Sequence, residues 1–302
     1  MQTIKATKFQ WIDLEQPNAD DTMIIKKKFN LHPIVVEEFC TPTLRPKAVE
    51  YDTCLYLAIH IPLFNEDSRT TFPGELDIAI TETALITSHE KDIWQLTDFF
   101  NELKQDKKKR EAYMSESPAA LLRYIIEMLL ESCFPKLDHI SEKLDYIEAE
   151  IFAEHEKEMV LEISVAKRDI LNFRRTMKPQ RSILESLSQK DFRLISHDIR
   201  PYFQDLIGTN IRIWNTLESF KETIESLEDT NNSLLSNKLN LTMKVLTIFS
   251  AIMLPMTVYS NVLAMSADIP FGKSPHAFLI HTSIMIMISL LTITIFRFKK
   301  WL

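Results

Sequence analysis

Two long apolar segments near the C-terminus dominate the hydrophobic pattern of this chain. Residues 245–263 form a run of 19 amino acids without a charge, and residues 277–296 form a run of 20 that contains one histidine. At the rise of an α-helix each run would measure roughly 28–30 Å, which is the thickness of the apolar core of a bilayer. The pattern therefore predicts two transmembrane helices and a membrane domain over residues 245–302.

The first third of the chain alternates between strand-like and helix-like patterns. Apolar segments rich in β-branched and aromatic residues predict strands at residues 11–14, 47–51, 53–62, 75–81 and 84–88. Helical spacing of apolar residues predicts helices over residues 19–30 and 92–107. Together these segments predict a cytoplasmic α/β domain over residues 1–115.

The pattern from residue 116 to residue 244 is helical throughout. Apolar residues recur there at spacings of three and four, first at Leu137, Ile140, Leu144, Ile147 and Ile151, then at Ile163, Ala166, Ile170, Phe173 and Met177. These seams predict two antiparallel helices that turn near residues 153–157. A third helix is predicted from about Phe203 to Leu263, roughly 90 Å long. The predicted fold class is an α+β cytoplasmic domain followed by long stalk helices and two C-terminal transmembrane helices.

A polar seam follows one face of the predicted third helix at spacings of three and four. Its members are Asn240, Met243, Thr247, Ser250, Leu254, Thr257, Asn261 and Ala264. Polar groups inside a membrane face either a partner helix or water. The seam is therefore either an interface between helices or the lining of a pore. A pore would require several copies, because two spans cannot enclose one.

The chemistry of this seam bears on the ion that a pore would pass. Hydroxyl and amide oxygens suit a hydrated hard cation such as Mg²⁺, whereas the seam holds no cysteine or histidine for a softer metal. Met243, Leu246 and Leu254 are apolar positions on or beside the seam. They would form either constrictions that close by excluding water or ordinary contacts between helices. In the second span we expect His281 to be neutral and hydrogen-bonded rather than part of a proton path.

Charge is distributed unevenly between the two parts of the chain. The net charge of −7 divides into +4 for residues 244–302 and −11 for residues 1–243. An acidic cytoplasmic part disfavours nucleic acid as a partner and favours cations. Lysines precede the first span, and Arg297, Lys299 and Lys300 follow the second. The rule that cytoplasmic flanks are basic therefore predicts that both termini are cytoplasmic.

Composition excludes several function classes. The chain has only three glycines, so no phosphate-binding loop can be written. Its three cysteines form no C-x-x-C pair, which argues against a zinc cluster or a disulfide framework. No set of residues with the spacing of a nucleophile and its base occurs. The sequence therefore predicts neither an enzyme nor an organic cofactor.

Short motifs spread along the chain resemble those of a known family. They include Trp11-Ile-Asp-Leu14, Leu31-His-Pro33, Arg45-Pro-Lys47, Glu75-Leu-Asp77, Pro201-Tyr-Phe203, Pro255-Met-Thr257 and Lys299-Lys-Trp-Leu302. In this order, with two spans at the end, they resemble the CorA family of divalent-cation transporters over nearly the whole chain. The resemblance implies a funnel-shaped homopentamer in the cell membrane whose pore is lined by the first span. It also implies passive influx of a divalent cation, with Mg²⁺ as the expected ion, gated by cytoplasmic metal.

The resemblance also assigns candidate residues at the outer end of the first span. Where the family carries Gly-Met-Asn, this chain has Ala264, Met265 and Ser266, which the resemblance makes the selectivity filter. Asn261 lies one turn below. It would contribute either a ring of carboxamides at the pore mouth or a hydrogen bond between helices. Asp268 in the outer loop would either concentrate cations at the mouth or be one solvated carboxylate.

One cytoplasmic acid completes the candidate sites. Asp205 matches a family residue that binds regulatory divalent ions between cytoplasmic domains, although an isolated surface carboxylate is the alternative. Mg²⁺ would then be both the transported and the regulatory ion. Two other functions stay open: a Zn²⁺, Co²⁺ or Ni²⁺ transporter of the ZntB type, and a membrane-anchored sensor or scaffold that does not transport.

Overall fold

The computed structural model describes residues 1–43, 45–265, 271 and 275–299. They divide into two compact units, residues 1–229 and residues 230–302. The fold class predicted from the sequence is confirmed: an α+β part is followed by long helices and two apolar C-terminal helices. The predicted division at residues 115 and 244 stays a prediction.

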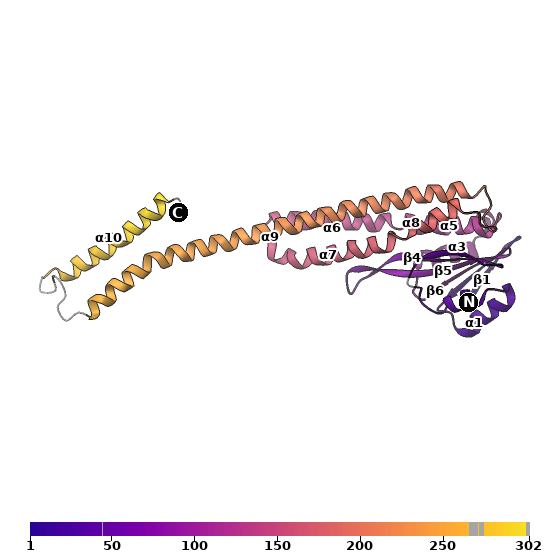
Figure 1. The fold of residues 1–302 in the computed structure, drawn as a ribbon, viewed down its shortest axis with the longest axis horizontal. Coiled ribbons are helices and arrows are strands. Elements are labelled where there is room, and N and C mark those ends of the chain that lie inside the picture. Colours follow the sequence, from indigo (N-terminus) through magenta and orange to yellow (C-terminus); the bar gives the residue numbers. More distant parts are fainter. Residues whose placement is uncertain (44, 266–270, 272–274, 300–302) are drawn as a thin grey trace. The chain divides into compact units, whose positions relative to one another are not determined.

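A six-stranded sheet organises the first unit (Figure 1). Its strands are β1 (Gln2–Lys5), β2 (Gln10–Glu15), β3 (Lys47–Glu50), β4 (Leu55–Asn65), β5 (Thr70–Ile80) and β6 (Ala84–His89). Their order across the sheet is β1-β2-β6-β5-β4-β3, and β2 runs parallel to β6 while the other neighbours are antiparallel. The five predicted strands are all present, and β1 is an additional short one.

Helices cover both faces of this sheet. One face carries α1 (Ala19–Phe29) and α2 (Pro33–Glu38), whose apolar residues share a core cluster with β2, β4, β5 and β6. The other carries α3 (Trp94–Gln105), α4 (Lys107–Tyr113), α5 (Pro118–Glu131), α6 (Phe134–Phe152), α7 (Glu156–Met177) and α8 (Gln180–Gln189). Of these helices, α5, α7 and α8 pack most extensively against the sheet, and Phe99 and Phe100 of α3 contact Trp11 of β2. The first unit therefore has three layers.

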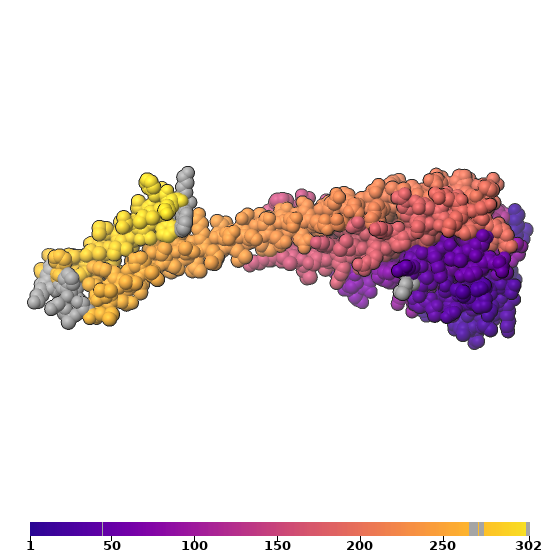
Figure 2. Space-filling model, in the orientation of Figure 1, coloured from indigo at the N-terminus to yellow at the C-terminus, as the bar shows by residue number. Residues whose placement is uncertain are grey.

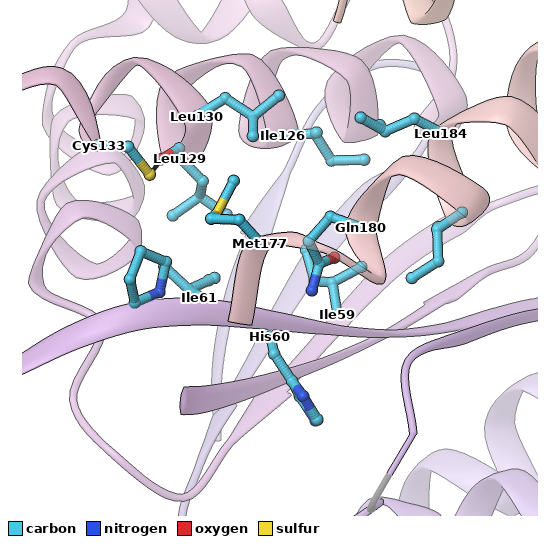
Figure 3. A pocket seen from close by; sticks show the side chains of 12 residues that line it. Ile59, His60, Ile61, Ile126, Leu129, Leu130, Cys133, Met177, Gln180 and Leu184 are labelled. Atoms are coloured by element: carbon cyan, nitrogen blue, oxygen red, sulfur yellow. Dashed lines mark hydrogen bonds between the residues drawn. The ribbon is translucent and has the colours of Figure 1, made fainter. Parts of the chain in front are cut away.

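Successive side chains of strand β4 point to opposite faces of the sheet, so they contribute to two different cores. Figure 3 shows Ile59 and Ile61 pointing toward the helical layer, while His60 points to the opposite side of the strand. There the His60 Nε2 lies 3.0 Å from the carbonyl oxygen of Thr43. The cavity between β4 and the helices measures only about 30 Å³, so this core is closely filled.

The two helical seams predicted from the sequence form the hairpin of α6 and α7. All ten of their apolar residues are buried. The turn between the helices falls at residues 153–155, as predicted. The tip of the β4–β5 hairpin is fixed to α7, since Arg69 makes two bonds of 2.7 and 2.8 Å to Glu162 and the Thr71 amide donates to Asp169. This hairpin therefore holds the sheet to the stalk helices.

Helix α9 (Arg200–Met265) is a single helix of 66 residues, which confirms the predicted long helix. It continues through Pro255, as a membrane segment can when neighbouring groups compensate for the lost amide. In the first unit it is fixed to α7 by ion pairs from Lys167 to Glu228 and from Arg174 to Glu218. The Arg174 guanidinium also lies 4.8 Å from the ring centre of Trp214. Helix α10 (Ala277–Phe298) is the second apolar helix.

A carboxyl group buried in the sheet, that of Asp77, makes stability depend on pH. Asp77 on β5 accepts a 2.6 Å hydrogen bond from the Tyr56 hydroxyl, and burial raises its pKa from an ordinary value of 3.8 to about 8. The native state therefore keeps a proton that the unfolded chain loses above about pH 4. As pH rises through this window, loss of the proton stabilises the unfolded state relative to the native state. The free energy of unfolding therefore falls.

We accordingly expect the unfolding temperature of the detergent-solubilised protein to fall between about pH 5 and pH 8, and to fall less steeply in Asp77→Asn. A residual slope is expected from His89. Burial opposes its charge, but Asp13, 3.4 Å away, outweighs burial and raises the pKa of His89. Stability from this pair is lost as pH rises through that raised pKa. Equal slopes in both proteins would show that Asp77 does not carry the effect.

Candidate functional site

The polar seam predicted from the sequence lies on an uncovered face of α9. Each of its eight members is exposed in the single chain. The members are Asn240, Met243, Thr247, Ser250, Leu254, Thr257, Asn261 and Ala264. Because they are exposed, the polar side chains of the seam can contact either a second copy of the chain or water.

Helix α10 packs against α9, as Figure 2 shows for the yellow and orange segments. The Tyr259 hydroxyl lies 2.8 Å from Nδ1 of His281, and the Ser289 hydroxyl donates to the sulfur of Met256 at 3.1 Å. At 100° per residue, Met256 and Tyr259 lie about 150° around the helix from the seam. The second span therefore leaves the seam uncovered. His281 is hydrogen-bonded, as the sequence predicted.

Hydroxyl groups of the seam present acceptor oxygens outward. Thr247 donates to the carbonyl oxygen of Met243 at 2.7 Å, and Thr257 donates to that of Met253 at 2.9 Å. Because each hydroxyl proton is used within the helix, the lone pairs of the oxygen remain available. Asn261 makes no hydrogen bond to any residue that the structure describes, so its carboxamide is also available. Such neutral oxygen groups suit the water shell of a hard cation.

The three candidate gate residues occupy two positions around the helix. Met243 and Leu254 lie on the seam itself, and both are exposed. Leu246, also exposed, lies about 70° to one side at helical geometry. Apolar rings at Met243 and Leu254 would interrupt the polar seam along its length, which is the arrangement that closure by excluding water requires. Their role as a gate stays a prediction.

The candidate filter coincides with the end of α9. Ala264 and Met265 are the last two residues of the helix, and Met265 is 87% exposed. Ala264 is helical, so the backbone at this position does not need the positive φ that glycine would permit. Ser266 and Asp268 lie outside the described residues. The roles of these two residues at the pore mouth stay predictions.

Asp205 lies in the first turns of α9, in the first unit, and its side chain is exposed. Within the described part of one chain there is no group of three or more His, Cys, Asp or Glu side chains placed to hold a metal ion. A regulatory ion at Asp205 would therefore need ligands from another copy of the chain. Asp205 belongs to the first unit and is not a member of the seam, which lies in the second.

Some contacts between α9 and α10 could not be predicted from the sequence. Tyr259 and Met256 fix α10 against α9, yet neither stood out as a polar partner. The available signal was a tyrosine and a histidine within the two apolar runs. Spacing within one helix cannot show which residues of two helices meet, so only the structure pairs them.

Comparison with known proteins decides the family. The family model described as CorA-like Mg2+ transporter protein matches residues 6–300. This chain belongs to the CorA family. The cobalt/magnesium transport protein CorA of Thermotoga maritima is 26% identical over 295 residues, covering 97% of this chain and 83% of the relative. The zinc transport protein ZntB of Yersinia enterocolitica is 17% identical over 293 residues, covering 97% and 88%.

Solved structures agree on the fold of the CorA family. The complete CorA magnesium transporter of Methanocaldococcus jannaschii superimposes with a TM-score of 0.85 at 22% identity, covering 99% of this chain and 93% of that one. CorA proteins are membrane transporters of divalent cations and not enzymes, and this chain is a member with two helices that can span a membrane. The resemblance read from its motifs is thereby confirmed.

Proposed function

We propose that this CorA protein is a passive Mg²⁺ channel whose pore is lined by α9 from several copies of the chain. The observation that carries the proposal is the oxygen-rich seam, exposed on the face of α9 that α10 leaves uncovered. Two spans per chain cannot close around an ion path, so an oligomer is required. The family resemblance supports a homopentamer.

The proposed preference for Mg²⁺ rests on the chemistry of the seam. Mg²⁺ gives up its water reluctantly, so a path for it needs neutral oxygen acceptors that contact a hydrated ion. Thr247, Thr257 and Asn261 supply such acceptors, and a cysteine or histidine that would favour a softer ion is missing from the seam positions of α9. The printed name of the Thermotoga relative, a cobalt/magnesium transport protein, supports the same class of ion.

The direction of flow follows from the proposed orientation. With both termini in the cytoplasm, a negative interior would draw the ion inward, by about 2.3 kcal/mol per elementary charge per 100 mV. Asp268 would attract cations at the outer mouth. Asp205, together with ligands from a neighbouring copy, would bind cytoplasmic Mg²⁺ and close the pore when internal Mg²⁺ is high. This arrangement would give feedback on the transported ion.

A second candidate is transport of Zn²⁺, Co²⁺ or Ni²⁺, favoured by the similarity to a zinc transport protein. A third is a sensor or scaffold without transport, favoured by Ala264 and Ser266 in place of the family's glycine and asparagine. All three candidates share the fold, so only the ion flux separates them.

Flux into liposomes tests the proposal. The purified protein is reconstituted with a Mg²⁺-sensitive dye inside, and influx of Mg²⁺, Zn²⁺ and Co²⁺ is measured in parallel. We expect saturable Mg²⁺ influx that is blocked by cobalt(III) hexaammine, which resembles hydrated Mg²⁺ in size and shape. Zn²⁺ influx without Mg²⁺ influx would favour the second candidate. Absence of any flux from well-folded oligomers at low internal Mg²⁺ would favour the third.

A further inference from the structure

A groove of about 790 Å³ opens on the first unit between α3, α4 and α5, and it belongs neither to the membrane helices nor to Asp205. This volume lies in the range of small-molecule sites. The side chains that line it include four aromatic rings and three carboxylates, and among the described residues no lysine, arginine or histidine lines it. The groove is therefore built for a ligand that is both apolar and positively charged.

Aromatic rings form a fixed wall of the groove. Phe99 and Tyr113 meet at right angles with ring centres 5.3 Å apart, and Tyr113 meets Tyr124 in the same way at 4.8 Å. These contacts hold the three rings in place against one another. Trp94, at the start of α3, is 58% exposed, which leaves its large indole ring accessible beside them. An accessible indole is the aromatic group that attracts organic cations most strongly.

The charge in the groove is concentrated on Asp98. Glu102 is paired with Lys109, and Glu127 is paired with Arg123 at 3.0 Å. Asp98 is exposed, and it has neither an ion pair nor a hydrogen bond with any residue that the structure describes. One carboxylate on α3, a single turn from Trp94, is therefore left for a cation from outside the chain.

A buried amide in the lining also lacks a partner. Gln95 is only 4% exposed, and its Nε2 donates to the Ser132 hydroxyl at 3.3 Å. Ser132 itself donates to the carbonyl oxygen of Leu129 at 2.8 Å, so it must accept from Gln95, and this fixes which end of the amide faces it. The Gln95 Oε1 is left buried without a donor. Because this oxygen is itself buried, an N–H group of a ligand in the groove can reach it only when the Gln95 side chain turns outward.

We propose that this groove binds a small organic ammonium ion, such as a linear polyamine. The ammonium group pairs with Asp98, while the aliphatic chain lies along the rings of Trp94 and Tyr113. A metal ion does not fit this lining, because aromatic walls offer it no ligands and no metal-holding group of side chains occurs in the described chain. The site is independent of the pore and stands whether or not the protein passes Mg²⁺.

Calorimetric titration of the full-length protein in detergent with spermidine tests this site. We expect saturable binding that Asp98→Asn weakens at least about tenfold, through loss of the charged partner. Trp94→Ala is expected to weaken it at least about fivefold, through loss of the cation–π contact. Both residues are exposed, so neither change should unfold the protein. Asp67→Asn, in the exposed turn between β4 and β5, removes the same charge elsewhere and should leave the affinity unchanged.

Four results would overturn the proposal. The first is the absence of spermidine binding to the unmodified protein. The second is equal weakening by Asp67→Asn and Asp98→Asn, which would show general attraction to an acidic surface. The third is displacement of spermidine by an equal concentration of Mg²⁺, since a divalent site would then be present. The fourth is tighter binding of a blocked tripeptide with one central lysine, which would assign the groove to a protein side chain rather than to a free amine.

Discussion

Replacing Asn261 by alanine is expected to lower Mg²⁺ influx into liposomes at least about tenfold, which corresponds to about 1.4 kcal/mol on the barrier. The side chain of Asn261 is exposed on the seam, one turn below the end of α9, and its carboxamide has no partner in the described chain. In an oligomer, one such group per copy would form a ring of acceptors for the hydrated ion. Alanine removes the whole ring at once.

A matched control lies next to it. Ser260 is also polar and exposed, but at helical geometry it lies about 100° around α9 from Asn261. We expect Ser260→Ala to transport at the rate of the unmodified protein. Normal Mg²⁺ influx through Asn261→Ala would contradict the proposed role of Asn261 in ion passage. Loss of oligomers in that variant, seen by size-exclusion chromatography, would instead point to a hydrogen bond between helices.

Leu254→Ser is expected to raise Mg²⁺ influx at least about tenfold when internal Mg²⁺ is high. A ring of leucines excludes water from the closed pore, whereas a ring of serines does not. Leu254 is 68% exposed and lies on the seam between Ser250 and Thr257. A ring of leucines at this level would close the path without any charged group. Serine would let the closed pore fill with water, so the channel would leak when it should be shut.

The control for this change is Met253→Ser. Met253 is the preceding residue and is 45% exposed, but it lies about a quarter turn from the seam. The measurement is dye-reported influx into liposomes loaded with low or high internal Mg²⁺. We expect Met253→Ser to keep its inhibition by internal Mg²⁺. Equal leak through both variants would mean that loosened contacts in the membrane helices, and not a water-excluding ring, cause the effect.

The features that repeat along the chain were predictable from sequence. The seams of α6 and α7 follow from apolar residues at spacings of three and four, and every one of them is buried. The length of α9 follows because Gly208 is the only weak point for a helix between Phe203 and Leu254, and Pro255 is tolerated within it. The seam itself needed no structure, because a polar stripe in an apolar run is visible as periodicity.

Contacts between elements were beyond the reach of the sequence. The six residues of α2 are too few to show a helical period. The parallel pairing of β2 with β6 joins segments about 70 residues apart, and no local pattern encodes it. The same holds for Tyr259 with His281, and for the buried carboxyl of Asp77, which accepts a hydrogen bond from Tyr56 on the neighbouring strand. Periodicity gives the face of an element, while the partner of that face comes from the fold.

The central claim, that the seam of α9 lines the ion path, can be tested by modifying single cysteines. The background is Cys40→Ser, because Cys40 is exposed while Cys54 and Cys133 are buried. Thr257→Cys places a thiol on the seam, and Ile252→Cys places one on the face that α10 covers. Mg²⁺ influx is measured before and after a positively charged methanethiosulfonate reagent.

We predict that the reagent abolishes influx through Thr257→Cys and leaves influx through Ile252→Cys unchanged. Mass spectrometry of each sample shows whether the thiol has reacted. Full influx through a Thr257→Cys protein whose thiol is completely modified would contradict the account, because a charged adduct in the ion path must obstruct it.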